Sequence, residues 1–278
     1  MSIATEIERL QNAKASIKTS IENKGVEVGD GTLDTYASKI DEIPIGGSDD
    51  TFAELVRGTL IDFVAPAGTT KIKRNLFYYD ESIQTADLRN VEESLGTESF
   101  RNATNLVSVI MPENLTAYMP FNSRVFLNCS ALKSFEYLGQ GTITSASPNV
   151  FGNCSVLETV YMPSLSISNT MQMFSNCTKL KKVELKATGI GSNFFNNCSA
   201  LETLILNRNY DKVATLSNIY SFSATPIEAG TGYIYVPKAL LSEDDATKDY
   251  RRATNWSTFA NQFRAIEDYP EICAWGEE

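Results

Sequence analysis

A phrase of the form Phe-x-Asn-Cys-[Ser/Thr]-x-Leu recurs along this chain at a nearly fixed interval, and an apolar, alternating segment follows each copy. In a looser copy that begins at Phe100, Ala103 replaces the cysteine. Successive phenylalanines are 23, 26, 25, 23, 21 and 27 residues apart, at Phe77, Phe100, Phe126, Phe151, Phe174, Phe195 and Phe222. A repeat of this length is typical of a solenoid, in which each coil packs against its two neighbours.

The segment after each phrase alternates between apolar and polar residues, as in Leu180-x-x-Val183-x-Leu185. Alternation with a period of two indicates a strand with one buried face. Stacked coils therefore predict a parallel strand ladder whose inward residues are Val109, Phe135, Val160, Val183 and Leu204. The residues beside them are predicted to point outward and to form a candidate ligand face: Ser108, Ile110, Ser134, Glu136, Thr159, Tyr161, Lys182, Glu184, Thr203 and Ile205. An ordinary solvated face, or ligand binding by the aromatic loop Phe77-Tyr78-Tyr79, are the alternatives.

The other repeated positions have structural interpretations. The phenylalanine is expected to fill the interior of the coil, and the asparagine to be buried and to hydrogen-bond the backbone where the chain turns into the strand. The asparagine column is Asn102, Asn128, Asn153, Asn176 and Asn197. Four of the five cysteines share one repeat position, which predicts a buried column of reduced thiols at Cys129, Cys154, Cys177 and Cys198. Cys273 lies outside this column and is also expected to be reduced.

The phrase and its strand resemble the BspA-type leucine-rich repeat of bacterial surface and phage proteins over residues 55–270. This resemblance implies a right-handed, β-rich solenoid used for adhesion or ligand binding, without a catalytic residue. We therefore expect a β-rich (α+β) leucine-rich-repeat solenoid at residues 47–230, with a helical attachment module before it, at 1–46, and a helical cap after it, at 231–278.

The first 23 residues have the pattern of an amphipathic helix. Apolar residues follow heptad-like spacing, with Lys14 at the missing position, and the predicted oligomerisation seam is Ile3, Ile7, Leu10, Ile17 and Ile21. Three heptads are short for an isolated coiled coil, so the helix is expected to need other copies or a docking surface.

The segment that follows resembles helical modules that open many phage tail and other virion proteins. The matching residues are Lys24-Gly25-Val26-Glu27-Val28, Gly31, Leu33, Tyr36-Ala37 and Lys39-Ile40. The resemblance implies attachment to other virion proteins. A helical hairpin that caps the first repeat is the alternative interpretation of this segment.

The C-terminal residues are expected to close the stack. Residues 232–237 read as a final strand, and helical patterns follow at 238–250 and 256–266, the second with Trp256, Phe259, Ala260 and Phe263 on one face. An open solenoid end exposes its core and a strand edge, so these aromatic residues are interpreted as the core of a cap.

Composition argues against several classes of partner and of catalytic chemistry. A formal charge of −10 and an isoelectric point near 4.7 argue against nucleic acid or an anionic membrane as the partner. No apolar run approaches the roughly 20 residues that span a bilayer. The chain contains no histidine, which excludes Ser-His-Asp and Cys-His catalysis and the commonest zinc ligand. The acidic groups Asp80-Glu81, Glu92-Glu93 and Glu243-Asp244-Asp245 read as solvated surface, so we expect no enzyme and no cofactor.

Two main hypotheses for the function remain, and a polysaccharide-cleaving enzyme is kept as a third alternative. The first is a virion protein of the tail tip, a fibre or the head surface, attached through residues 1–46 and displaying the solenoid to a host-surface glycan or protein. We expect it to be a homo-oligomer, with a trimer favoured, and not to insert into a membrane. The second is a bacterial cell-surface adhesin or glycan-binding protein. Residues 1–20 lack the pattern of a secretory signal peptide, and this favours the virion over the cell surface as the location.

Overall fold

The computed structural model describes Lys18 and residues 59–209, 211–242 and 244–274. Two compact units divide the chain, Met1–Leu60 and Ile61–Glu278, and the second contains the repeats. The predicted helix and seam at residues 3–21 and the virion-like segment at 24–40 lie outside the described residues, apart from Lys18. The roles of these segments in oligomerisation and attachment stay predictions.

Short strands and helical turns make up the second unit. Its strands are β1 (Asp62–Val64), β2 (Thr69–Ile72), β3 (Thr85–Asp87), β4 (Val91–Leu95), β5 (Ser108–Ile110), β6 (Ser134–Glu136), β7 (Thr142–Ile143), β8 (Thr159–Thr170), β9 (Lys182–Ile190), β10 (Thr203–Leu206), β11 (Thr215–Leu216), β12 (Tyr233–Val236) and β13 (Phe263–Ala265). Its helical segments are the α-helix α4 (Pro226–Ala229) and the 3-10 helices η1 (Ile219–Phe222), η2 (Lys238–Leu240), η3 (Ala246–Lys248), η4 (Trp256–Gln262), η5 (Ile266–Asp268) and η6 (Pro270–Cys273). Within the residues that the structure describes, none of the helices has the length and apolar character needed to cross a bilayer.

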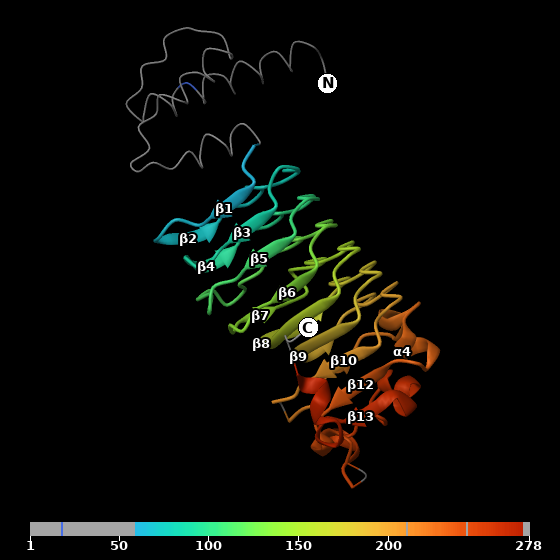
Figure 1. Ribbon diagram of the computed structural model, residues 1–278. Coiled ribbons are helices and arrows are strands. Elements are labelled where there is room, and N and C mark those ends of the chain that lie inside the picture. Colours follow the sequence, from blue (N-terminus) through green and yellow to red (C-terminus); the bar gives the residue numbers. More distant parts are fainter. Residues whose placement is uncertain (1–17, 19–58, 210, 243, 275–278) are drawn as a thin grey trace, which may run out of the picture. The chain divides into compact units, whose positions relative to one another are not determined.

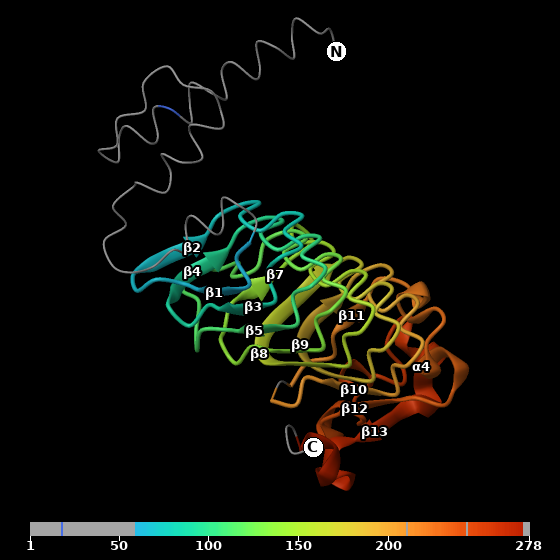
Figure 2. The same ribbon diagram turned by 45° about the horizontal axis from the view of Figure 1, so that its top comes forward.

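The strands form the predicted parallel ladder. One sheet has the order β1-β3-β5, and a larger sheet contains the path β6-β8-β9-β10-β12-β13. Equivalent repeat positions lie side by side: Phe135 pairs with Val160, Val160 with Val183, and Val183 with Leu204. Figures 1 and 2 show the strands stacked coil upon coil along this unit. The prediction of a β-rich solenoid with a parallel ladder is confirmed.

The seven repeated phenylalanines form one continuous stack through the core. Successive ring centroids are 4.9, 5.5, 5.3, 5.4, 5.5 and 5.5 Å apart from Phe77 to Phe222. All seven side chains are fully buried. Offset or near-parallel rings at this separation attract one another in addition to burying apolar area. The predicted interior role of the phenylalanine column is therefore confirmed.

The four repeated cysteines form a buried column of free thiols. Each Sγ–H donates to the carbonyl oxygen of a phenylalanine in the preceding coil, at 3.0–3.1 Å, so the thiols satisfy backbone acceptors inside the stack. Burial raises the pKa of Cys198 to about 12 and also raises the pKa of Cys129 and Cys177. The expected column of buried, reduced thiols is confirmed; Cys273 is also free but only partly buried.

The asparagine column differs from the prediction in its bonding and its burial. Each Nδ2–H of Asn153, Asn176 and Asn197 donates to the Oδ1 of the preceding asparagine, at 2.7, 2.8 and 3.0 Å, and Asn128 donates in the same way to Asn102. Side chains therefore bond one another rather than the turn backbone. Asn102 is buried and Asn128 half-buried, but the last three are exposed.

Backbone conformation explains why asparagine occupies this column. All five residues have a φ angle between 59° and 64°. This left-handed region is costly for most side chains, and asparagine tolerates it better than other residues except glycine. The repeat thus selects asparagine for the turn it allows, and the amide ladder follows from the stacking of equivalent turns.

The C-terminal residues depart from the predicted helices. The strand expected at 232–237 is present as β12, but the helical structure among the described residues of 238–250 consists of the 3-10 helices η2 and η3. Residues 256–266 form η4, then β13, which pairs in parallel with β12. The predicted helix at 256–266 is therefore wrong at its second half, because Phe263 begins a strand that extends the ladder.

Aromatic side chains continue the core into this region. Trp256 is fully buried, lies 5.7 Å from Phe222 at the end of the phenylalanine stack, and donates its Nε1–H to the oxygen of Ala214 at 2.7 Å. Tyr250 and Phe263 pack against the same indole, with centroids at 5.3 and 5.9 Å. These contacts place aromatic residues over the last phenylalanine ring of the repeats.

Candidate functional site

The candidate ligand face is open at one end of the ladder and covered at the other. Ser108, Ile110, Ser134 and Glu136 are exposed. Thr159, Tyr161, Lys182 and Thr203 are half-buried, whereas Glu184 and Ile205 are buried, with 1% and 0% of their surface exposed. The prediction that all ten residues form one solvent-facing surface is therefore wrong at Glu184 and Ile205. The open part of the face lies on β5, β6 and the first half of β8.

The chain's own C-terminal segment causes this difference. Ile205 packs with Tyr235 and Ile266 in a small cluster, against which Ile272 and Cys273 also lie. Tyr269 contacts Tyr235 edge-on at 5.6 Å. The segment containing η5 and η6 thus returns across the outward side of the ladder at β10 and β12. Sequence periodicity carried no signal for this long-range contact.

Charged groups lie beneath the same segment. The Lys182 ammonium donates to the oxygen of Ala274 at 2.7 Å, and Arg208 pairs with the Glu184 carboxylate at 3.8 Å. Burial lowers the pKa of Lys182, and Glu184 opposes that shift. Burial and the Glu184 charge raise the pKa of the Tyr161 hydroxyl. The Lys182 hydrogen bond ties the segment to β9 and makes this end of the face a packed contact.

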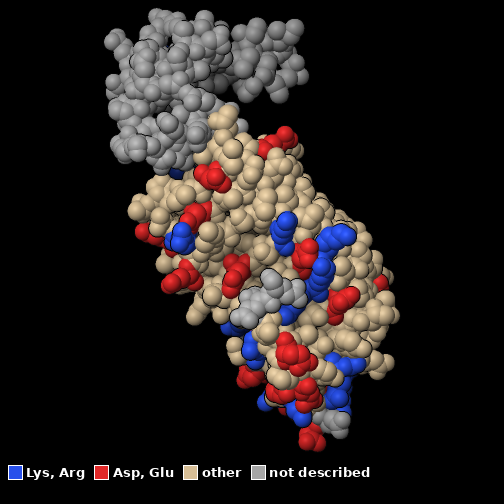
Figure 3. Space-filling model, in the orientation of Figure 1, with Lys and Arg blue, Asp and Glu red and all other residues tan. Residues whose placement is uncertain are grey.

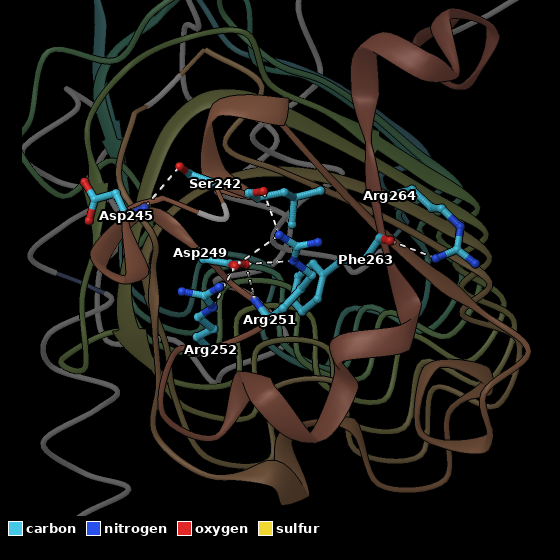
Figure 4. A network of polar contacts seen from close by, with 8 residues as sticks. Ser242, Asp245, Asp249, Arg251, Arg252, Phe263 and Arg264 are labelled. Atoms are coloured by element: carbon cyan, nitrogen blue, oxygen red, sulfur yellow. Dashed lines mark hydrogen bonds and ion pairs between the residues drawn. The ribbon is translucent and has the colours of Figure 1, made fainter.

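A second polar network stabilises the loop between η3 and η4. Figure 4 shows the Asp249 carboxylate between the guanidinium groups of Arg251 and Arg252. Arg251 donates to Asp249 Oδ1 at 2.9 Å and to the Leu241 oxygen at 2.7 Å, while Arg252 Nε lies 3.5 Å from Asp249 Oδ2. Burial opposes ionisation of Asp249, but the arginine hydrogen bonds outweigh it and lower the pKa of this carboxyl. The network fixes the loop between η3 and η4.

The strand ladder is interrupted between β5 and β6. Both strands are edges, of the three-stranded and the eight-stranded sheet respectively. A long hydrogen bond of 3.5 Å, from Lys133 N to Val107 O, joins the two coils where the strands begin. Beyond that bond the coils separate around a cavity of about 330 Å³, and Val109 is half-exposed although Phe135, Val160 and Val183 at the matching positions are buried.

Large inward side chains explain the interruption. Phe135 stands at the position that Val109 and Val160 occupy in the adjacent coils, and its ring lies 5.4 and 4.7 Å from Phe126 and Phe151. Tyr137, the next inward residue, is 1% exposed, and its hydroxyl accepts a hydrogen bond from Leu115 N at 2.9 Å. Because these rings need more room than valine, they hold β6 away from β5.

Two of the acidic residues that catalysis could have used, Asp80 and Asp245, have local structural partners. The Asp80 carboxylate accepts hydrogen bonds from Ser82 N at 2.8 Å and Ser82 Oγ at 2.6 Å. The Asp245 carboxylate accepts from Thr247 N at 3.0 Å and Thr247 Oγ1 at 2.6 Å. Both therefore stabilise turns, as short acidic side chains commonly do.

Comparison with known proteins places the repeats in a family. A model described as "BspA type Leucine rich repeat region" matches residues 48–136 and 118–225. No curated protein sequence matches the chain. The family description does not refer to a virion protein, so the virion role predicted from the N-terminal resemblance has no support from this match.

Three solved structures are similar to this chain. A leucine-rich repeat protein of T. pallidum is 19% identical, with a TM-score of 0.43 and coverage of 56% of this chain and 73% of that one. A leucine-rich cell surface protein of Faecalibacterium prausnitzii is 19% identical, with a TM-score of 0.37 and coverage of 55% and 49%. A leucine-rich repeat protein of Bacteroides ovatus is 20% identical, with a TM-score of 0.36 and coverage of 64% and 52%.

Proposed function

We propose a recognition role for this chain, which belongs to the BspA-type leucine-rich repeat family: it binds a macromolecule at a bacterial cell surface through the open outward face of β5, β6 and β8. The observation that carries the proposal is the set of outward side chains on β5, β6 and the first half of β8 that stay exposed or half-exposed. Hydroxyl, carboxylate and aromatic groups alternate there on adjacent strands, at Ser108, Ser134, Glu136, Thr159 and Tyr161.

The physical character of this face supports binding rather than catalysis. Side chains from neighbouring strands project in parallel from a rigid ladder. They can therefore contact a flat or extended partner simultaneously, without the entropic cost of ordering a loop. Figure 3 shows charged residues of both signs scattered among uncharged ones over the second unit in this view, with more of them toward its C-terminal end. A face with hydroxyls, one tyrosine and isolated charges suits a protein or glycan bound by several weak contacts.

The attachment module belongs to the same proposal. Residues 1–46 would anchor or oligomerise the protein, with a trimer favoured, and several copies would multiply weak contacts. The family match favours a bacterial surface over a virion as the setting. Virion attachment rested on the resemblance of residues 24–40, and that resemblance has no second observation behind it.

A binding-array experiment tests the proposed face. Fluorescently labelled full-length protein is applied to an array of glycans and an array of secreted and extracellular-matrix proteins. We expect at least one ligand whose signal falls about tenfold in the variant Glu136→Ala/Tyr161→Ala, because two side chains at the centre of the contact are lost.

A matched variant controls for loss of an aromatic side chain elsewhere. Tyr220 in η1 is 64% exposed and outside the ladder face, so Tyr220→Ala should leave the signal unchanged. Circular dichroism confirms that each variant is folded. No ligand on either array, or a ligand lost with Tyr220→Ala and retained with Glu136→Ala/Tyr161→Ala, would exclude this face as the recognition site.

A further inference from the structure

The interruption of the ladder creates a cavity in the middle of the open face. Its walls come from the ends of β5 and β6 and the residues that follow them, Met111 and Leu138 among these. Elsewhere in the larger sheet, neighbouring coils pair through backbone hydrogen bonds, as β6 does with β8. A volume of about 330 Å³ is at the lower end for ligand sites and suits one long side chain.

The walls of the cavity are apolar and exposed. Ile110 and Leu138 have 50% and 54% of their surface open to solvent, and half-exposed Val109 of β5 also lines the cavity. Exposed aliphatic side chains gathered in one hollow lower the free energy when a partner covers them, because that burial removes apolar area from water. An occupant of this cavity therefore has an aliphatic portion.

Two carboxylates complete the lining. Glu113 and Glu136 are exposed and contribute to the same cavity, one after β5 and the other at the end of β6. Among the residues that the structure describes, those that line the cavity include no lysine or arginine, and the whole chain has a formal charge of −10. Carboxylates next to an apolar hollow complement a cation on an aliphatic stem, which is the structure of lysine and arginine side chains.

We propose that this cavity is a specificity pocket that receives a lysine or arginine side chain of a protein partner. The aliphatic stem packs between Ile110 and Leu138, and the cationic head pairs with Glu113 and Glu136. This inference rests on the proposed function, because it identifies the class of partner that the open face recognises.

The same cavity is poorly suited to a sugar ring. Glycan pockets commonly present an open aromatic face on which the pyranose packs, but the tyrosine in this lining is buried: Tyr137 is 1% exposed and its hydroxyl is bonded to Leu115 N. The exposed walls are aliphatic. The observations therefore favour a protein partner over a glycan.

Methyl NMR on the full chain tests the pocket. The probes are two pentapeptides, acetyl-Gly-Ser-Lys-Ser-Gly-amide and the same peptide with norleucine in place of lysine, which keeps the stem and removes the charge. We expect the lysine peptide to shift the methyl resonances of Ile110 and Leu138, with an affinity about tenfold higher than that of the norleucine peptide, because only lysine pairs with the carboxylates. The shifts should weaken as salt is raised.

Paired variants separate the pocket from the general negative charge of the protein. Glu113→Gln/Glu136→Gln should raise the Kd for the lysine peptide about tenfold, whereas Glu92→Gln/Glu202→Gln, which removes two exposed carboxylates elsewhere, should leave it unchanged. Equal binding of the two peptides, equal effects of the two double variants, or unshifted Ile110 and Leu138 methyls would each overturn the proposal. If the parent protein does not bind the lysine peptide but does bind an array ligand whose signal depends on Tyr161, the pocket is rejected and the proposed function is retained.

Discussion

Replacing Phe151 by alanine should lower the free energy of unfolding by about 3–5 kcal/mol, the range for removing a large aromatic side chain from a core. The ring is fully buried and lies in the middle of the stack, 5.3 Å from Phe126 and 5.4 Å from Phe174. Its removal also withdraws support from Phe135 at 4.7 Å, the residue that holds β6 in place. Urea denaturation followed by circular dichroism measures this change.

Val156→Ala provides the control on the same coil. Val156 is 36% exposed, so the change should be within about 0.5 kcal/mol, as at most surface sites. A loss below about 1 kcal/mol in Phe151→Ala would contradict a stack in which each ring supports both neighbours.

Stability should fall in alkaline solution, and Cys198 should account for a defined part of that fall. The thiol has a folded-state pKa of about 12 against an ordinary value of 9.0. Between these values the unfolded chain has lost the proton and the folded chain retains it, so raising the pH favours unfolding. The contribution of Cys198 is complete below pH 9 and disappears as the pH approaches 12. By pH 11 the loss amounts to about 2–3 kcal/mol.

The variant Cys198→Ala isolates this contribution. Alanine is tolerated at the matching position of another coil, Ala103, and the Phe174 oxygen keeps the hydrogen bond from Cys177 N at 3.1 Å. The free energy of unfolding should therefore fall less between pH 8 and pH 11 in Cys198→Ala, by about 2–3 kcal/mol, while Ser199→Ala behaves as the parent protein. An identical alkaline loss in all three proteins would contradict a buried, protonated thiol at this position.

Contacts that recur in every coil could be predicted from the sequence. The spacing of the phenylalanines identified all seven members of the stack, because a solenoid brings equivalent positions into register. The asparagine column was identified for the same reason, but its bonding was not. A positive φ at Asn153 is a property of the turn, and the recurrence of asparagine, which favours that region, was the available signal.

Contacts that occur once along the chain were missed. Ile110 and Ile205 occupy the same outward position in two repeats, yet one is 50% exposed and the other fully buried. The difference comes from Ile266 and Ile272, which lie more than sixty residues beyond Ile205 in sequence and have no repeat equivalent. The apolar residues at 256, 259, 260 and 263 fit a helix by spacing, but pairing with β12 made Phe263 the start of a strand.

The interruption between β5 and β6 had a signal in the sequence that periodicity did not reveal. Phe135 and Tyr137 preserve the apolar alternation, so the pattern predicts an ordinary strand. Their size is the relevant property, because the inward residues of β3 and β5 are Ala86 and Val109. Side-chain volume at inward positions therefore indicates where such a ladder separates, and here it places a cavity within the candidate face.

Hydrogen–deuterium exchange of the full chain, with and without the ligand identified on the array, distinguishes recognition by the open strands from recognition by the part of the ladder beneath the C-terminal segment. Bound ligand should slow exchange in β5, β6 and the first half of β8 and leave β10 unchanged, since Ile205 is already covered. Protection confined to β10 and the C-terminal segment, or to turns outside the ladder, would show that recognition does not use the open strands.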